Sequence, residues 1–198
     1  MNVATLGFDE QLQELMQWLN QSTSHSIVAC FDLPDSPEAI QLAQSAVTDE
    51  SWEALLSKTV ADVVLVAARP LRGEDAERRN EQLRKLVQAA IPLVLVHPGC
   101  EMLMGLELEM IRQDSQCPMI PYHAGLWSWQ FQQLPHVVNG DDSAGKPLGK
   151  IEQLVWERRA TKRDDAAVMK HFARDAMMLR HLLTKVTHVS ATGATEEQ

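Results

Sequence analysis

Residues 61–98 decide the fold, and they read ADVVLVAARPLRGEDAERRNEQLRKLVQAAIPLVLVHP. The apolar runs at residues 61–67 and 92–98 are rich in Val and Leu and do not alternate with polar residues. Such runs are typical of strands that are buried on both faces of a parallel sheet. Between them, residues 74–90 carry apolar side chains at helical spacing. The segment therefore predicts a strand–helix–strand unit, which is right-handed in nearly all proteins.

Strand and helix patterns alternate on both sides of this unit. Further strands are predicted at residues 2–8, 26–32 and 118–122, and further helices at 9–21, 36–46, 51–59, 102–113 and 126–134. This alternation predicts an α/β fold with a doubly wound, mostly parallel, Rossmann-like sheet. Ligands of such sheets bind beyond the carboxyl ends of the strands. We therefore expect a site near residues 67–70 and 97–100.

A change in composition predicts a domain boundary near residue 139. Residues 139–150 combine Asn-Gly, Asp-Asp, Ser, Gly and Pro, which favour a linker. The predicted organisation is a dinucleotide-binding-type domain at 1–138, this linker, and a truncated C-terminal segment at 151–198. Within that segment we expect a strand at 151–156, a long amphipathic helix at 164–184 and the start of a further strand at 186–190.

Composition limits the classes of function. The 198 residues are 45% hydrophobic and 23% charged, with a net charge of −9. An acidic chain is a poor match for nucleic acid, and no apolar run approaches the ~20 residues that cross a bilayer. The three cysteines, Cys30, Cys100 and Cys117, have unrelated spacings. They predict neither a disulfide framework nor a metal site, and they fit the reducing cytoplasm.

The order of three motifs resembles a known family. WEALL (52–56), ADVVLVA (61–67) and RKLVQAAIPLVLVHP (84–98) together are similar to the Gfo/Idh/MocA oxidoreductases, over roughly residues 2–125 and more weakly over 148–191. The resemblance implies a Rossmann domain that binds NAD or NADP, followed by a second domain that forms the substrate site and often the oligomer contact. Relatives usually have some 150 or more further residues, so this chain is expected to be either part of a longer protein or a naturally short form.

A dinucleotide site needs a glycine-rich turn after the first strand, because glycines let the backbone approach the pyrophosphate. Only Gly7 remains of the Gly-x-Gly-x-x-Gly pattern, and Asp9 and Glu10 place negative charge where the phosphates should lie. Asp32 ends the second strand, 25 residues after Gly7, like the acid that binds a ribose hydroxyl. An Asp after a strand is more often a turn or cap residue, so that reading stays open as well. The candidate cofactor-binding residues are Gly7, Phe8, Asp32, Ala67, His97 and Pro98.

The resemblance also locates the catalytic positions. In the family a Glu-Lys-Pro closes the strand that ends near residue 97, and its Lys takes part in catalysis; here the residues are Val96, His97 and Pro98. His97 can act as an acid or base near neutral pH, or it can be a polar residue that bonds to a loop. Arg174 and Met177 stand at the family's His-x-x-Asp positions. His97 and Arg174 are therefore the catalytic candidates, although neither Arg174 nor Met177 can perform the original proton transfer.

Two functions remain open from the sequence. The first is an NAD(P)-dependent oxidoreductase of Gfo/Idh/MocA type, which acts on a small molecule with altered cofactor and catalytic motifs. The second is a non-catalytic binding or regulatory protein that keeps the Rossmann scaffold and self-associates. We expect a cytoplasmic homo-oligomer, because methionine-rich apolar segments would lack their usual second-domain cover. Neither nucleic acid nor a membrane is expected as a partner.

Overall fold

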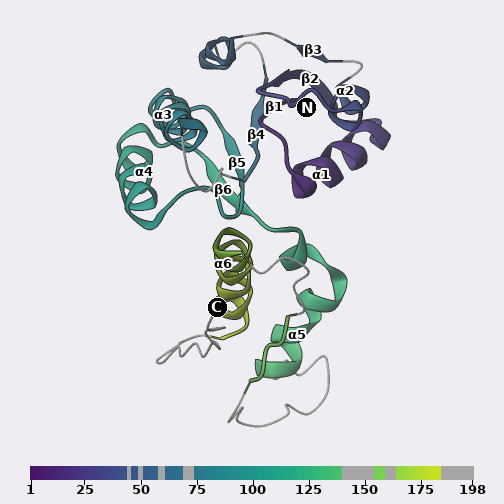
Figure 1. The fold of residues 1–198 in the computed structure, drawn as a ribbon, viewed down its shortest axis with the longest axis vertical. Coiled ribbons are helices and arrows are strands. Elements are labelled where there is room, and N and C mark those ends of the chain that lie inside the picture. The colour runs from purple at the N-terminus through teal and green to yellow at the C-terminus, as the bar shows by residue number, and fades with distance from the viewer. Residues whose placement is uncertain are drawn as a thin grey trace, which may run out of the picture. The chain divides into compact units, whose positions relative to one another are not determined.

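The computed structural model describes residues 1–43, 46–48, 51–57, 61–68, 74–139, 154–158 and 164–183. The chain divides into two compact units, Met1–Ala124 and Gly125–Gln198. Each unit is described by itself below, and the ribbon of the first unit can be followed in Figure 1.

A six-stranded sheet forms the centre of the first unit, in the order β3-β2-β1-β4-β5-β6. Every neighbouring pair of strands is parallel. The strands are β1 (Asn2–Leu6), β2 (Ser26–Phe31), β3 (Val47–Thr48), β4 (Val63–Val66), β5 (Leu93–Val96) and β6 (Met119–Tyr122). The order reverses direction between β1 and β4, as in a doubly wound Rossmann-like fold. The predicted fold class is confirmed.

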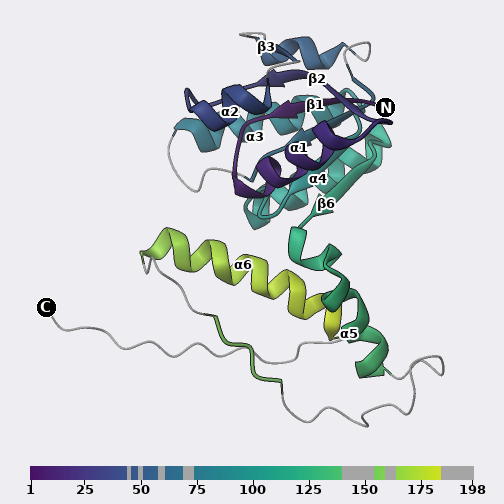
Figure 2. The same ribbon diagram turned by 90° about the vertical axis from the view of Figure 1, so that its right-hand side faces the viewer.

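Helices cover both faces of this sheet. They are α1 (Glu10–Gln21), α2 (Pro37–Leu42), the 3₁₀ helix η1 (Trp52–Leu56), α3 (Glu74–Gln88) and α4 (Met102–Ser115). Figure 1 shows α1 and α2 on one side of the strands and α3 and α4 on the other, and Figure 2 is turned so that α1 and α2 face the viewer.

Two apolar cores lie against the two faces of the sheet. Val64 and Val66 of β4 belong to the core that contains Leu83 and Leu86 of α3. Leu65, between them in the sequence, belongs to the opposite core, with residues of α1. Successive strand residues point to opposite faces, so an uninterrupted apolar run is what a strand covered on both faces requires. This is the physical reason why residues 61–67 lack alternation.

The edges of the sheet differ from the sequence expectation. The helix predicted at 36–46 ends at Leu42, with Ala43 as its C-cap. It is followed by the edge strand β3, which the sequence did not predict because two residues give no periodic signal. The helix predicted at 51–59 is a shorter 3₁₀ helix, and residues 58 and 59 lie outside the described part of the chain.

The second unit contains α5 (Trp129–Asn139) and α6 (Asp165–Leu182), preceded by the 3₁₀ helix η2 (Ala124–Trp127). Its small core is formed by Phe131, Met178 and Leu182. The long C-terminal helix is thus confirmed within two residues at each end. The helix expected at 126–134 begins later and continues through Pro135.

The strand predicted at 151–156 is wrong for its last three residues, which have no strand structure. Residues 151–153 and the strand expected at 186–190 lie outside the described residues. Most of the linker 139–150 does too, so the domain organisation 1–138, 139–150 and 151–198 stays a prediction. No helix in the described ranges is long and apolar enough to cross a membrane.

Candidate functional site

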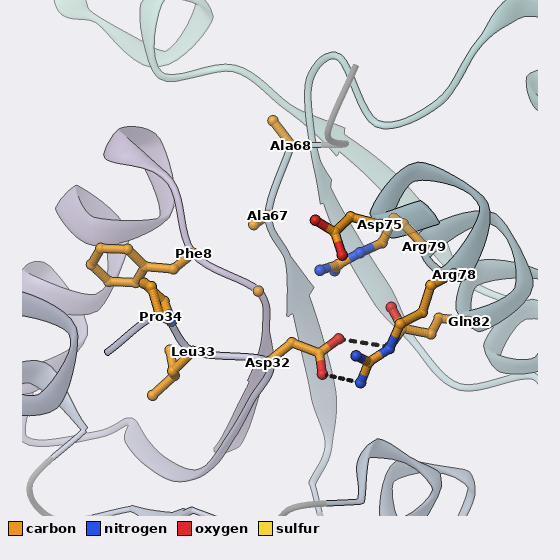
Figure 3. Close-up of a pocket in the computed structure, with 11 residues that line it drawn as sticks. Phe8, Asp32, Leu33, Pro34, Ala67, Ala68, Asp75, Arg78, Arg79 and Gln82 are labelled. Carbon is orange, nitrogen blue, oxygen red and sulfur yellow. Dashed lines mark hydrogen bonds and ion pairs between the residues drawn. The ribbon is translucent and has the colours of Figure 1, made fainter. Parts of the chain in front are cut away.

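A pocket of about 450 Å³ lies at the carboxyl ends of β1, β2 and β4, beside α3 (Figure 3). Residues that follow the three strands form one part of its wall, and the first turns of α3 form the other. The lining residues are Gly7, Phe8, Asp32, Leu33, Pro34, Ala67, Ala68, Asp75, Arg78, Arg79 and Gln82. Four predicted cofactor residues are therefore brought together here: Gly7, Phe8, Asp32 and Ala67.

The N-terminus of α1 is occupied by a side chain of the protein itself. The carboxylate of Asp9 accepts hydrogen bonds from the backbone N–H of Gln11 at 2.8 Å and of Leu12 at 3.0 Å. Its other oxygen accepts a bond from the N–H of Ala68, after β4. These donors point to the place where a helix N-terminus binds a phosphate. Asp9 is thus both the N-cap of α1 and an internal anion at the place where a dinucleotide's pyrophosphate would bind.

Asp32 is held by α3. Its Oδ1 accepts a bond from Arg78 Nη2 at 2.6 Å, and its Oδ2 accepts one from Gln82 Nε2 at 2.7 Å. Both contacts are visible in Figure 3. The residue has a φ of 51°, a left-handed conformation in which Asp is more common than most residues. A ribose hydroxyl would have to compete with two side chains for this carboxylate.

Gly7 makes room for a buried arginine. It has a φ of +80°, and a Cβ placed on it would lie 2.4 Å from Nη2 of Arg79. The Nη1 of Arg79 donates to the carbonyl oxygen of Leu6 at 2.7 Å, and only 6% of the residue is exposed. The single remaining glycine of the motif is therefore required here by its own backbone conformation and by Arg79.

Burial sets the electrostatics of this arginine. Removal from water lowers the pKa of Arg79, because desolvation disfavours the charged form, and the positive charge of Arg78 acts in the same direction. The carboxylates of Asp32, Asp9 and Asp75 oppose the shift. An arginine remains protonated in proteins, so the pocket wall contains a buried positive charge.

His97 and Pro98 do not line this pocket. They follow β5 and are joined by a cis peptide bond. The N–H of His97 donates to the carbonyl oxygen of Tyr122 at 2.7 Å, and its own carbonyl accepts a bond from Gln11 Nε2 at 3.2 Å. Because Gln11 Oε1 accepts a bond from the N–H of Ala124, this side chain ties α1 to the ends of β5 and β6.

Arg174, the other catalytic candidate, is half-buried on α6 of the second unit. Its role and that of His97 stay predictions, as do the cofactor contacts. Among the described residues, no three His, Cys, Asp or Glu side chains gather as the ligands of a metal ion would.

Sequence reasoning did not identify Arg79, Gln82 or Gln11. One signal was available: Arg79 lies on the buried stripe of α3, three residues after Ala76 and four before Leu83. A charged residue in an apolar stripe is rarely buried without a partner. The position therefore pointed to a polar contact inside the fold, although not to which group it meets.

Comparison with known proteins supports the fold alone. Neither the protein-family models nor the curated proteins contain a match to this chain. Among solved structures, it is similar to biliverdin reductase from Synechocystis sp. PCC 6803, in complex with biliverdin and NADP+, at 17% identity and a TM-score of 0.55. It is also similar to D-galactose-1-dehydrogenase from Rhizobium etli, at 13% identity and a TM-score of 0.56.

A third similar structure is GenD2 from gentamicin A biosynthesis in complex with NAD, at 13% identity and a TM-score of 0.58. The matches cover 70%, 70% and 73% of this chain, but only 42%, 42% and 40% of the respective neighbours. The chain thus spans about two-fifths of the length of these structures. The predicted fold is confirmed: the first unit has a Rossmann-like fold, which it shares with these oxidoreductase structures.

Proposed function

We propose that the chain is a non-catalytic binding or regulatory protein built on a Gfo/Idh/MocA-type Rossmann domain with altered cofactor and catalytic motifs. One observation carries this proposal: the carboxylate of Asp9 accepts bonds from the N–H groups of Gln11, Leu12 and Ala68. A dinucleotide needs donors at this helix N-terminus for its pyrophosphate. In this chain those donors are already bonded to the negatively charged carboxylate of Asp9.

Repulsion between Asp9 and the pyrophosphate of a dinucleotide is large enough to decide whether the cofactor binds. Two like charges 4 Å apart repel by roughly 4 kcal/mol at an effective dielectric constant of about 20. That corresponds to an affinity loss on the order of a thousandfold, before the loss of the N–H donors is counted. A cofactor in the usual pose would have to displace Asp9 from α1.

The other motif positions support the same proposal. The ribose-binding candidate Asp32 is engaged by Arg78 and Gln82. His97 stands at the position of the family's catalytic Lys, and Arg174 stands in place of its His. The glycine turn, the Lys-Pro motif and the His-x-x-Asp motif are therefore all altered. Together these three changes make hydride transfer of the family's usual kind a poor description of this chain.

An NAD(P)-dependent oxidoreductase is the second candidate. The observation in its favour is the pocket itself, which contains Gly7, Phe8, Asp32 and Ala67 at the strand ends where dinucleotides bind. In that case NAD or NADP would lie over these residues and reach toward His97 and Pro98. His97 would then be the acid or base for a small-molecule substrate.

Calorimetric titration with NAD(H) and NADP(H) separates the two candidates. We expect no binding by the natural chain up to millimolar cofactor. The Asp9→Gly variant restores Gly-x-Gly at positions 7 and 9 and frees the helix donors, so it should gain affinity for the cofactor. Glycine costs the helix cap only a few tenths of a kcal/mol, and the lost bond to the N–H of Ala68 costs about 1.5 kcal/mol or more. Asp164→Gly is the matched control, because Asp164 caps α6 of the second unit. Micromolar binding by the natural chain would overturn the proposal.

The binding protein is further proposed to act as a cytoplasmic homo-oligomer that takes a small-molecule ligand. The support for self-association is an exposed apolar stripe on α4, formed by Leu103, Leu106 and Met110. Large exposed apolar groups at helical spacing suit a contact with a second copy. Light scattering over a concentration series should detect a dimer that Leu106→Glu abolishes. A monomer at every concentration would contradict self-association.

A further inference from the structure

The buried arginine of the pocket has unmet hydrogen-bonding capacity. Arg79 is 6% exposed, and its only bond to a described residue is to the carbonyl oxygen of Leu6. Its Nε is buried, and no described residue supplies an acceptor for it. The carboxylate that acts on it most strongly, Asp32, is already bonded to Arg78 and Gln82. Nearby carboxylates act on Arg79 through space but are not bonded to it. Burial of a cation without a bonded anion is costly, so an anion that enters the pocket would find an unsatisfied donor.

An acceptor lies one helical turn away. Asp75 and Arg79 both line the pocket and are separated by four residues on α3, a spacing that places side chains on one face. Figure 3 shows the two side chains near each other without an ion pair between them. Asp75 is exposed, in the first turn of the helix. One wall therefore offers a cationic donor set and, beside it, an anionic acceptor.

We propose that this pocket binds a small organic acid that has a hydrogen-bond donor close to its carboxylate. The carboxylate pairs with the guanidinium of Arg79, and the donor bonds to Asp75. The chemistry is shared by 2-hydroxy acids and 2-amino acids. The inference rests on the proposed function, because it requires that no dinucleotide fills the pocket.

The charges of the wall favour a carboxylate over a phosphate. The lining residues include two carboxylates, Asp32 and Asp75, and two guanidinium groups, Arg78 and Arg79. The pair Asp32–Arg78 is already neutralised at 2.6 Å. A planar monoanion matches the guanidinium fork of Arg79, whereas a phosphate dianion would bring excess negative charge next to Asp75.

The opposite wall is apolar. Phe8, Leu33 and Pro34 line it, and Figure 3 places them across from the residues of α3. A short aliphatic or aromatic side chain of the ligand can be buried against these groups. The volume of about 450 Å³ is at the lower end of the range for small-molecule sites, which suits a ligand of this size.

Isothermal titration calorimetry on the full chain tests the inference with four matched probes. L-2-hydroxyisocaproate and L-leucine carry both the carboxylate and the donor. Isocaproate lacks the donor, and L-leucinamide lacks the carboxylate. We expect the first two to bind, with binding weakened by at least about tenfold for the other two. If only the hydroxy acid or only the amino acid binds, that identifies which donor Asp75 accepts.

Variants separate a ligand contact from a structural role. Arg79→Gln should weaken acid binding by at least about tenfold, and Arg84→Gln is the matched control, because Arg84 is paired with Glu107 outside the pocket. Since Arg79→Gln removes a buried group and can reduce folding, Asp75→Asn at the exposed end of the site provides a second test. It should weaken L-leucine more than isocaproate.

Two outcomes would overturn the inference. One is no heat from either acid up to about 10 mM, which would leave Arg79 as a packing partner of Gly7 only. The other is binding that neither Arg79→Gln nor Asp75→Asn changes. NADH is titrated in parallel, and its binding at micromolar concentration would refute the proposed function. If neither NADH nor the acids give heat, this inference alone is refuted.

Discussion

Replacement of Asp9 by alanine is expected to destabilise the first unit by about 2–3 kcal/mol. The substitution removes the N-cap of α1, with its bonds to Gln11 and Leu12, and such a loss typically costs about 1 kcal/mol. It also removes the acceptor of the Ala68 N–H, which joins the end of β4 to α1. A hydrogen bond to a charged group adds about 1.5 kcal/mol or more.

Urea unfolding followed by circular dichroism measures this loss. With a slope of about 2 kcal/mol/M, the unfolding midpoint should fall by about 1 M. Ser36→Ala is the matched control in the same unit, because Ser36 caps α2 through one bond to the N–H of Ala39 at 3.2 Å. A neutral cap with a single bond should cost no more than about 1 kcal/mol.

Equal midpoints for Asp9→Ala and Ser36→Ala would refute the reasoning, since the link between α1 and β4 would then contribute nothing. Amide hydrogen exchange provides a local check. The N–H of Ala68 should lose protection in Asp9→Ala and keep it in Ser36→Ala. Unchanged protection in both variants would mean that Asp9 does not hold this amide.

Three further outcomes are expected. Ala90→Gly should raise the free energy of unfolding by about 0.5–1 kcal/mol, measured by urea unfolding, because Ala90 has a φ of 54° after α3 and glycine adopts this conformation without strain. Glu109 should titrate near pH 2 by carboxyl NMR, because its bond to Arg112 lowers its pKa from 4.5 to about 2. The stability that this ion pair contributes is therefore complete above pH 4.5 and is lost as the pH falls through 2. Cys30 should react with a thiol reagent at pH 8 far more slowly than the half-buried Cys100, because burial raises the pKa of Cys30.

The fold was predictable because its signals are local. The uninterrupted apolar runs of β4 and β5 predicted strands with both faces buried, and both cores confirm that. Asp9 was predictable as a cap, because its type and position before α1 suffice. The edge strand β3 was not, because two residues leave no pattern, and its pairing with β2 is set by the tertiary structure.

The chemistry of the pocket was only half predictable. Gly7, Asp32 and Ala67 follow strands, so the rule for strand ends placed them together. The partners of Asp32 come from α3, 46 and 50 residues later in the chain. Which face of α3 meets that carboxylate depends on the packing of the helix, and no local pattern encodes it. For the same reason, the sequence suggested that Gly7 is a remnant of a nucleotide-binding motif. In the structure, Gly7 instead leaves room for the side chain of Arg79, which comes from α3.

The two borders of the sheet leave little opportunity for another chain to pair with it. On one side, the described part of the edge strand β3 offers the backbone of two residues. On the other, β6 carries Pro121, which has no N–H to donate. Strand-to-strand growth, the route by which exposed sheets propagate into fibrils, is thereby obstructed at both ends. An association of copies through the exposed side chains of α4 would then be independent of the sheet, so its strength could be changed by single substitutions without disturbing the strands.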